Sequence, residues 1–198
     1  MKPLREEVEE IIQREGWTKE AIDQMSKLDS FIKESQRLHP LSIGKPISYI
    51  AYSQKFTAIL VAMPRKVVKD HTFIDGTKVP CGATVAVATE NAHLNDNVYP
   101  DALTFDPFRF VKLKEQDATG RKFDIVTTSN DSLSFGHGRH SCPGRYFAAC
   151  ELKLMFAHVV MNYDVKIEND GVRPKDLWFL TSCVPNRDAK IFFRKRVL

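Results

Sequence analysis

Apolar positions near the N-terminus recur at helical spacing among charged residues. The positions concerned are Leu4, Val8, Ile11 and Ile12. Steps of three and four place all of them on one face of an amphipathic helix, which the pattern predicts over residues 3–14. Gly16 favours the end of this helix, and the hydroxyl of Thr18 can cap the next one.

The rest of the chain divides into helical, β-rich and irregular segments. A second amphipathic run predicts a helix over about 27–38, which ends shortly before a proline. Short runs rich in β-branched residues over 57–89 predict strands. Residues 90–134 are mostly irregular, and so long a stretch in a compact domain is typical of a functional segment. A strong helix is predicted from 143 to about 161, and alternating strand patterns follow it.

The expected fold class is mainly α with a small β component, an α+β arrangement. The positions expected to be buried on the last helix are Tyr146, Phe147, Cys150, Leu154, Ala157 and Val160. With 198 residues and 43% hydrophobic content, the chain can form one packed domain, or a large part of a bigger one.

Composition excludes several classes of function. The net charge of +4 is spread along the chain, so no nucleic-acid partner is expected. No apolar run is long enough to cross a bilayer, and the charged N-terminus does not resemble a secretory signal. Four scattered cysteines without a CxxC pair argue against a disulfide framework or a zinc ribbon and suit a reducing compartment.

One cysteine, Cys142, lies in the glycine-punctuated stretch FGHGRHSCPG at 135–144. Because Pro143 is favoured at the first position of a helix, Cys142 is predicted at about the N-cap, where the helix dipole favours a thiolate. The glycines allow the backbone to approach a flat ligand, and Phe135 can cover the sulfur. By themselves the residues leave a nucleophile, a redox thiol, a metal ligand and a small core side chain all open.

The stretch resembles the haem-ligand loop of the cytochrome P450 family, whose pattern is F-x-x-G-x-R-x-C-x-G. The matching residues are Phe135, Gly138, Cys142 and Gly144. His140 stands where the family usually has arginine, and a histidine there with Arg139 before it resembles fungal members.

Two further motifs stand in the family's order. Glu34 and Arg37 in KESQR resemble the E-x-x-R pair, and Arg109 in DPFRF resembles the arginine that completes a buried Glu-Arg-Arg cluster. An isolated Glu and Arg three positions apart on a helix are more often a solvated surface pair, so the combination of motifs carries the resemblance.

The resemblance implies roles for particular residues. Cys142 would be the proximal ligand of the iron of haem b, iron protoporphyrin IX. Phe135 and Gly138 would belong to the haem loop, while Arg65 in MPRK and His140 would meet the haem propionates. The structural cluster would consist of Glu34, Arg37 and Arg109.

The resemblance also implies an activity. The family's members are haem-thiolate monooxygenases, which insert one O2-derived oxygen atom into an organic substrate with electrons from a flavoprotein NADPH reductase. A small apolar substrate is expected, a terpenoid or another secondary metabolite. A complete fungal-type member would lie on the cytoplasmic side of the endoplasmic reticulum. This chain shows no membrane anchor and is expected to be soluble and cytoplasmic, or unstable.

The resemblance covers the C-terminal portion of the family, so residues 1–198 are expected to form the haem-binding part of a P450 domain. The fold would be incomplete without the distal helices, and activity of a truncated chain is doubtful. Residues 44–59 (GKPISYIAYSQKFTAI) are expected to be an insertion or translated intron, because RLHPLSI would join LVAMPRK directly without them.

Two alternatives remain at this stage. The chain could be a non-catalytic haem-binding fragment or interaction module. It could also hold zinc at His137, His140 and Cys142, although no fourth ligand is evident.

Overall fold

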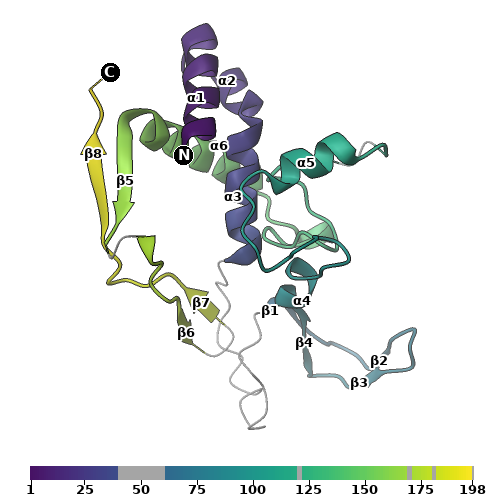
Figure 1. Ribbon diagram of the computed structural model, residues 1–198. Coiled ribbons are helices and arrows are strands. Elements are labelled where there is room, and N and C mark those ends of the chain that lie inside the picture. The colour runs from purple at the N-terminus through teal and green to yellow at the C-terminus, as the bar shows by residue number, and fades with distance from the viewer. Residues whose placement is uncertain (40–60, 120–121, 169–170, 180–181, 198) are drawn as a thin grey trace.

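The computed structural model describes residues 1–39, 61–119, 122–168, 171–179 and 182–197. The candidate insertion at 44–59 lies outside the described residues. Four helices pack together in one part of the molecule, and two-stranded antiparallel sheets and an irregular segment extend from it (Figure 1). This arrangement agrees with the predicted α+β class.

The helical part consists of α1 (Lys2–Glu15), α2 (Lys19–Gln24), α3 (Ser26–Leu38) and α6 (Arg145–Asn162). The apolar face predicted for the first helix is buried in α1. Gly16 has φ 69° at the end of α1, and the Thr18 hydroxyl accepts a 3.1 Å hydrogen bond from the Ala21 amide. The predicted end and cap are therefore both present.

The strands pair locally. The pairs are β1 (Val61–Lys66) with β4 (Thr84–Ala88), β2 (His71–Thr72) with β3 (Lys78–Val79), β5 (Tyr163–Ile167) with β8 (Ile191–Lys195), and β6 (Leu177–Phe179) with β7 (Ser182–Val184). All four pairs are antiparallel. The register of β1 against β4 shifts between Ala62 and Arg65, and Met63 has φ 54° within this irregularity.

The stretch predicted to be mostly irregular contains two short helices, α4 (Thr89–His93) and α5 (Arg109–Gln116). A separate cluster of buried side chains, formed by Tyr99, Ala102 and Phe110, fixes this stretch. The amide of Phe110 donates a 3.1 Å hydrogen bond to the hydroxyl of Ser30, which joins the start of α5 to α3. Both helices are too short for a periodic pattern of apolar residues to predict them.

The start of α6 corrects one prediction. Cys142 lies two residues before the N-cap, which is Gly144, and the helix begins at Arg145. The first intrahelical bond runs from the Ala148 amide to the Gly144 carbonyl at 3.0 Å. Proline at 143 thus belongs to the turn before the helix and not to its first position, so the sulfur of Cys142 is not at the helix cap.

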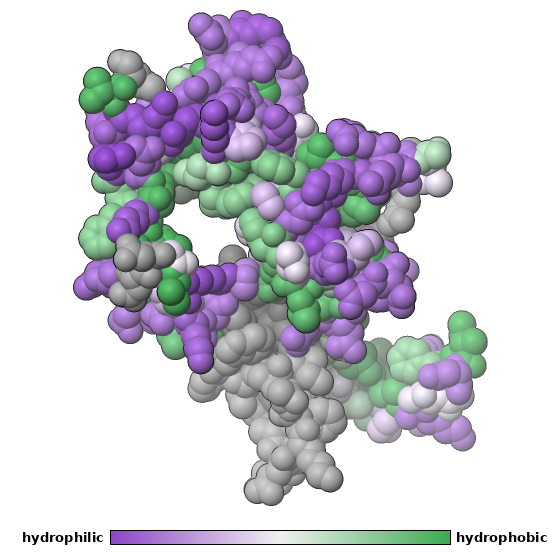
Figure 2. All heavy atoms as spheres, viewed as in Figure 1, coloured by the Kyte–Doolittle hydropathy of each residue, from purple (hydrophilic) through white to green (hydrophobic). Residues whose placement is uncertain are grey.

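Burial along α6 differs from the prediction as well. Ala157 and Val160 are buried and Cys150 is half-buried, but Tyr146, Phe147 and Leu154 are 61%, 74% and 44% exposed. Only one side of α6 packs against α1, α2 and α3, so apolar side chains on its other sides remain accessible. Hydrophobic atoms are accordingly visible at the surface below the charged helices (Figure 2). None of the helices in the described part of the chain combines the length and apolar character needed to span a bilayer.

Candidate functional site

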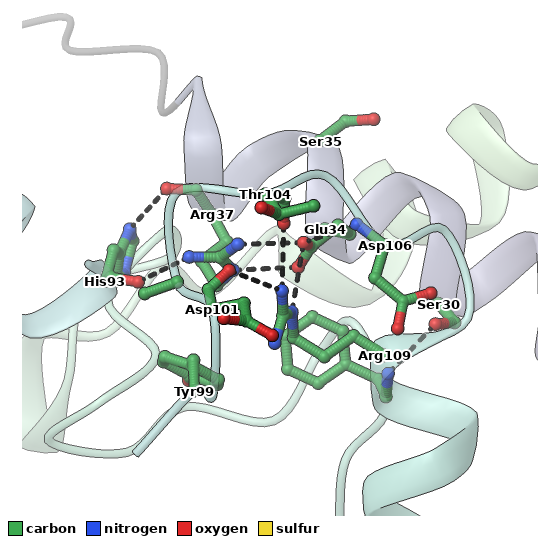
Figure 3. Close-up of polar contacts among 12 residues, drawn as sticks. Ser30, Glu34, Ser35, Arg37, His93, Tyr99, Asp101, Thr104, Asp106 and Arg109 are labelled. Carbon is green, nitrogen blue, oxygen red and sulfur yellow. Dashed lines mark hydrogen bonds and ion pairs between the residues drawn. The ribbon is translucent and has the colours of Figure 1, made fainter. Parts of the chain in front are cut away.

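A buried carboxylate joins α3 to the coil that precedes α5. Glu34 is fully buried, and its oxygens accept hydrogen bonds from Arg37 Nε at 2.7 Å and Arg37 Nη2 at 2.8 Å. Arg109 Nε lies 3.1 Å from the same carboxylate (Figure 3). The i, i+3 spacing places Glu34 and Arg37 on one face of α3. The structure therefore brings together the three residues that the motifs singled out.

The remaining donors of the two arginines bind backbone carbonyls. Arg37 Nη1 donates to the carbonyl of His93 at 2.7 Å. Arg109 donates to three carbonyls of the coil before α5, those of Pro100, Asp101 and Thr104. Because buried charges are costly unless they are paired and hydrogen-bonded, this complete set of partners explains how the cluster exists in the interior.

Burial alone would raise the pKa of Glu34. The hydrogen bonds from Arg37, from the amide of Asp106 and from Arg109 outweigh burial and hold this pKa below its ordinary value. Glu34 is therefore ionised at neutral pH, and the cluster is an anion shared by two cations.

A buried histidine lies beside the cluster at the end of α4. His93 is 1% exposed, its Nδ1 lies 3.2 Å from the Arg37 carbonyl, and its Nε2 accepts the Leu133 amide at 2.9 Å. Since Nε2 accepts a hydrogen bond, the proton of the neutral ring must be on Nδ1, which donates to the carbonyl. Burial lowers the pKa of His93 from 6.5 to about 4, so the ring is neutral at physiological pH.

Sequence reasoning did not identify His93. It belongs to none of the three motifs, and no local spacing distinguishes it from any other histidine at the end of a β-rich segment. Its partners, Arg37 and Leu133, are 56 and 40 positions away in the chain.

The cysteine loop is a compact turn with internal backbone hydrogen bonds. The Gly136 amide donates to the Leu133 carbonyl, and the Cys142 amide donates to the Phe135 carbonyl, both at 2.8 Å. Gly136 and Gly138 both have φ 70°, a conformation that favours glycine. Phe135 is half-buried and packs against the main core, so the loop is fixed at its N-terminal side.

The residues expected to contact haem are accessible side chains on this loop and on β1. Cys142 is half-buried and its thiol is free. His140 is exposed in the short 3-10 helix Gly138–His140, and Arg65 is exposed on β1. The sulfur of Met63 lies 3.6 Å from where a Cβ on Gly136 would be, so β1 runs close to the loop.

The donor set fits a haem better than a zinc ion. Among the described residues, no three His, Cys, Asp or Glu side chains are grouped so that they could hold a metal. His137, His140 and Cys142 are all described, so the structure does not support the zinc alternative. A single free thiolate would suit a haem iron, most of whose other ligands come from the macrocycle.

Comparisons with known proteins point to one family. The family model "Cytochrome P450" matches residues 53–192. Cytochrome P450 monooxygenase 151 from Postia placenta is 45% identical over 98% of this chain and 35% of its own length. Cytochrome P450 monooxygenase ptmQ from Penicillium ochrochloron is 38% identical over 99% of this chain and 35% of its own length.

A solved structure shows the same fold. The retinoic acid-bound cyanobacterial CYP120A1 superposes with a TM-score of 0.69 at 22% identity, over 98% of this chain and 39% of that one. The match of the family model to residues 53–192 shows that the chain belongs to the cytochrome P450 family. It spans about a third of the length of the curated relatives that it matches.

Proposed function

We propose that this chain is the haem-binding C-terminal part of a P450 monooxygenase, with Cys142 as the axial ligand of haem b. The observation that carries the proposal is the half-buried, free thiol of Cys142 in a turn whose backbone is fixed by the Phe135 carbonyl and the core. When bound, a haem with an axial thiolate supplies oxygen activation, because the thiolate donates electron density that favours O–O cleavage.

The chain's own residues would hold and orient this group. Arg65 and His140 would donate hydrogen bonds to the two propionates. Glu34, Arg37 and Arg109 would act at a distance by fixing the coil between α4 and α5.

The reaction that we propose for the whole protein is insertion of one O2-derived oxygen atom into a small apolar organic molecule, a terpenoid or another secondary metabolite. Electrons would come from a flavoprotein NADPH reductase, and the whole protein would work on the cytoplasmic side of the endoplasmic reticulum. These statements are supported by the family membership and by the monooxygenase names of the fungal relatives.

A carbon monoxide difference spectrum of the dithionite-reduced, haem-reconstituted chain tests the ligand. We expect a Soret band shifted far to the red in the natural chain and loss of that shift in Cys142→Ala. Cys81→Ala is the matched control, since Cys81 is also free but lies exposed in the turn between β3 and β4. Absence of the band in the natural chain, or its persistence in Cys142→Ala, contradicts the assignment.

A second candidate function is a non-catalytic haem-binding or interaction module. The exposed apolar side chains on α6, among them Tyr146, Phe147 and Met155, favour it because such surfaces commonly mark interaction sites. Incubation with a P450 reductase, NADPH and a panel of terpenoids separates the two functions. Formation of an oxygenated product supports the monooxygenase, whereas haem binding without product supports the module.

A further inference from the structure

His93 connects two parts of the candidate site that the motifs treat separately. On one side, His93 and Arg37 are linked twice, through Arg37 Nη1 to the His93 carbonyl and through the His93 ring to the Arg37 carbonyl. On the other side, His93 Nε2 accepts the amide of Leu133, two residues before the cysteine loop begins. A single imidazole thus connects the Glu34 cluster to the segment that carries Cys142.

The path continues into the loop through the backbone. The Leu133 carbonyl accepts a hydrogen bond from the Gly136 amide, and this bond closes a turn that contains Phe135. The Phe135 carbonyl then accepts the amide of Cys142. A displacement of Leu133 would therefore shift both Phe135 and Cys142.

We propose that His93 is a positioning residue for the Cys142 site, whose neutral ring fixes the cysteine loop relative to the Glu34 cluster. This inference rests on the proposed haem-thiolate function. Among the hydrogen bonds of the described residues, none joins His93 to Cys142, His140 or Arg65, and its link to the loop is the bond from the Leu133 amide.

Only the neutral ring can fill this role. A protonated ring would present Nε2–H to the Leu133 amide, so two donors would face each other and the bond would be lost. Burial disfavours the charged ring by lowering its pKa, and the neighbouring cations Arg37 and Lys33 oppose protonation as well.

Two substitutions separate the two hydrogen bonds of the ring. The amide of glutamine reaches the position of Nε2, so His93→Gln retains an acceptor for the Leu133 amide and loses the donor to Arg37. The shorter amide of asparagine reaches the position of Nδ1, so His93→Asn retains the donor and loses the acceptor. The pair therefore tests whether the loop depends on the bond to Leu133 specifically.

The first readout is hydrogen exchange of the backbone amides in the haem-free chain. We expect the amides of Leu133 and Cys142 to exchange about five- to tenfold faster in His93→Asn, as expected when one net hydrogen bond is lost from a local opening equilibrium. In His93→Gln they should exchange nearly as in the natural chain. Leu4→Ala is the control, because Leu4 is buried on α1 but does not belong to the core cluster against which Phe135 packs.

The second readout is the carbon monoxide spectrum of the haem-loaded variants. His93→Gln should keep the strongly red-shifted band, and His93→Asn should lose a substantial fraction of it. Equal exchange in the two variants, or equal acceleration at the loop in Leu4→Ala, would overturn the positioning role. If the natural chain shows no thiolate-type band, the proposed function fails, while the exchange experiment still decides whether His93 positions the loop.

Discussion

Acidification should destabilise the fold through His93. The ring is buried and neutral in the folded chain, with its pKa lowered from 6.5 to about 4, whereas the unfolded chain binds the proton with the ordinary value. Between these two values the unfolded state holds more protons, so stability falls as the pH falls. Each unit of pKa difference is worth about 1.4 kcal/mol, so the whole shift is worth about 3 kcal/mol. This contribution is fully present above pH 6.5, declines through the window, and is gone below about pH 4.

Urea unfolding followed by circular dichroism measures the effect when it is repeated at intervals from about pH 7.5 to pH 3.5. Other groups titrate in this range: Glu34 and Asp106 have lowered pKa values and also favour unfolding in acid, whereas burial raises the pKa of Asp29 and opposes it. His93→Gln retains these groups, so the difference between the natural chain and the variant isolates the histidine.

We expect the stability of the natural chain relative to His93→Gln to fall by about 3 kcal/mol between pH 6.5 and pH 4. A difference that stays constant over this window would refute the conclusion that the ring is held neutral. A difference that grows as the pH falls would mean that the folded protein prefers the charged ring, and the hydrogen-bond assignment to Leu133 would then be wrong.

Two further predictions concern the cluster and the loop. Glu34→Gln should lower the free energy of unfolding by about 3–5 kcal/mol, because it leaves two buried guanidinium groups without a carboxylate. In urea unfolding the exposed control Glu151→Gln should stay within about 0.5 kcal/mol of the natural chain, and an equally small loss for Glu34→Gln would show that the cluster is not a buried ion pair. His140→Ala should weaken haem binding about tenfold in a Soret titration, as loss of one charge-assisted hydrogen bond implies. His137→Ala on the same exposed loop should not, and unchanged binding in His140→Ala would remove His140 from the site.

Periodicity predicted the elements in which one face is buried along several turns. The apolar face of α1 and the limits of α3 follow from steps of three and four, since such a spacing has few other structural solutions. The Glu34 cluster was also recognisable, because motif residues far apart in the chain identify a contact that no local pattern contains. The short α5 was not predicted, since its position depends on contacts with α3.

The remaining differences have the same physical origin. Periodicity shows which face of α6 is apolar but not what packs against it, so Phe147 was expected to be buried and is exposed. His93 has only distant partners, so its role exists only in the folded chain. The N-cap was misplaced because proline is compatible both with a first helical position and with a preceding turn.

The coil between α4 and α5 shows how irregular backbone can be made rigid without a covalent bond. Its start is bound to Arg37 and its end carries Arg109, and both arginines meet on the carboxylate of Glu34. The two ends of the coil are thus held together at one carboxylate, much as a disulfide closes a loop. The hydrogen bonds from Arg109 to three carbonyls of the coil restrain the backbone between these ends. Such an ion-pair closure needs no oxidant to form, so this coil is held without a disulfide.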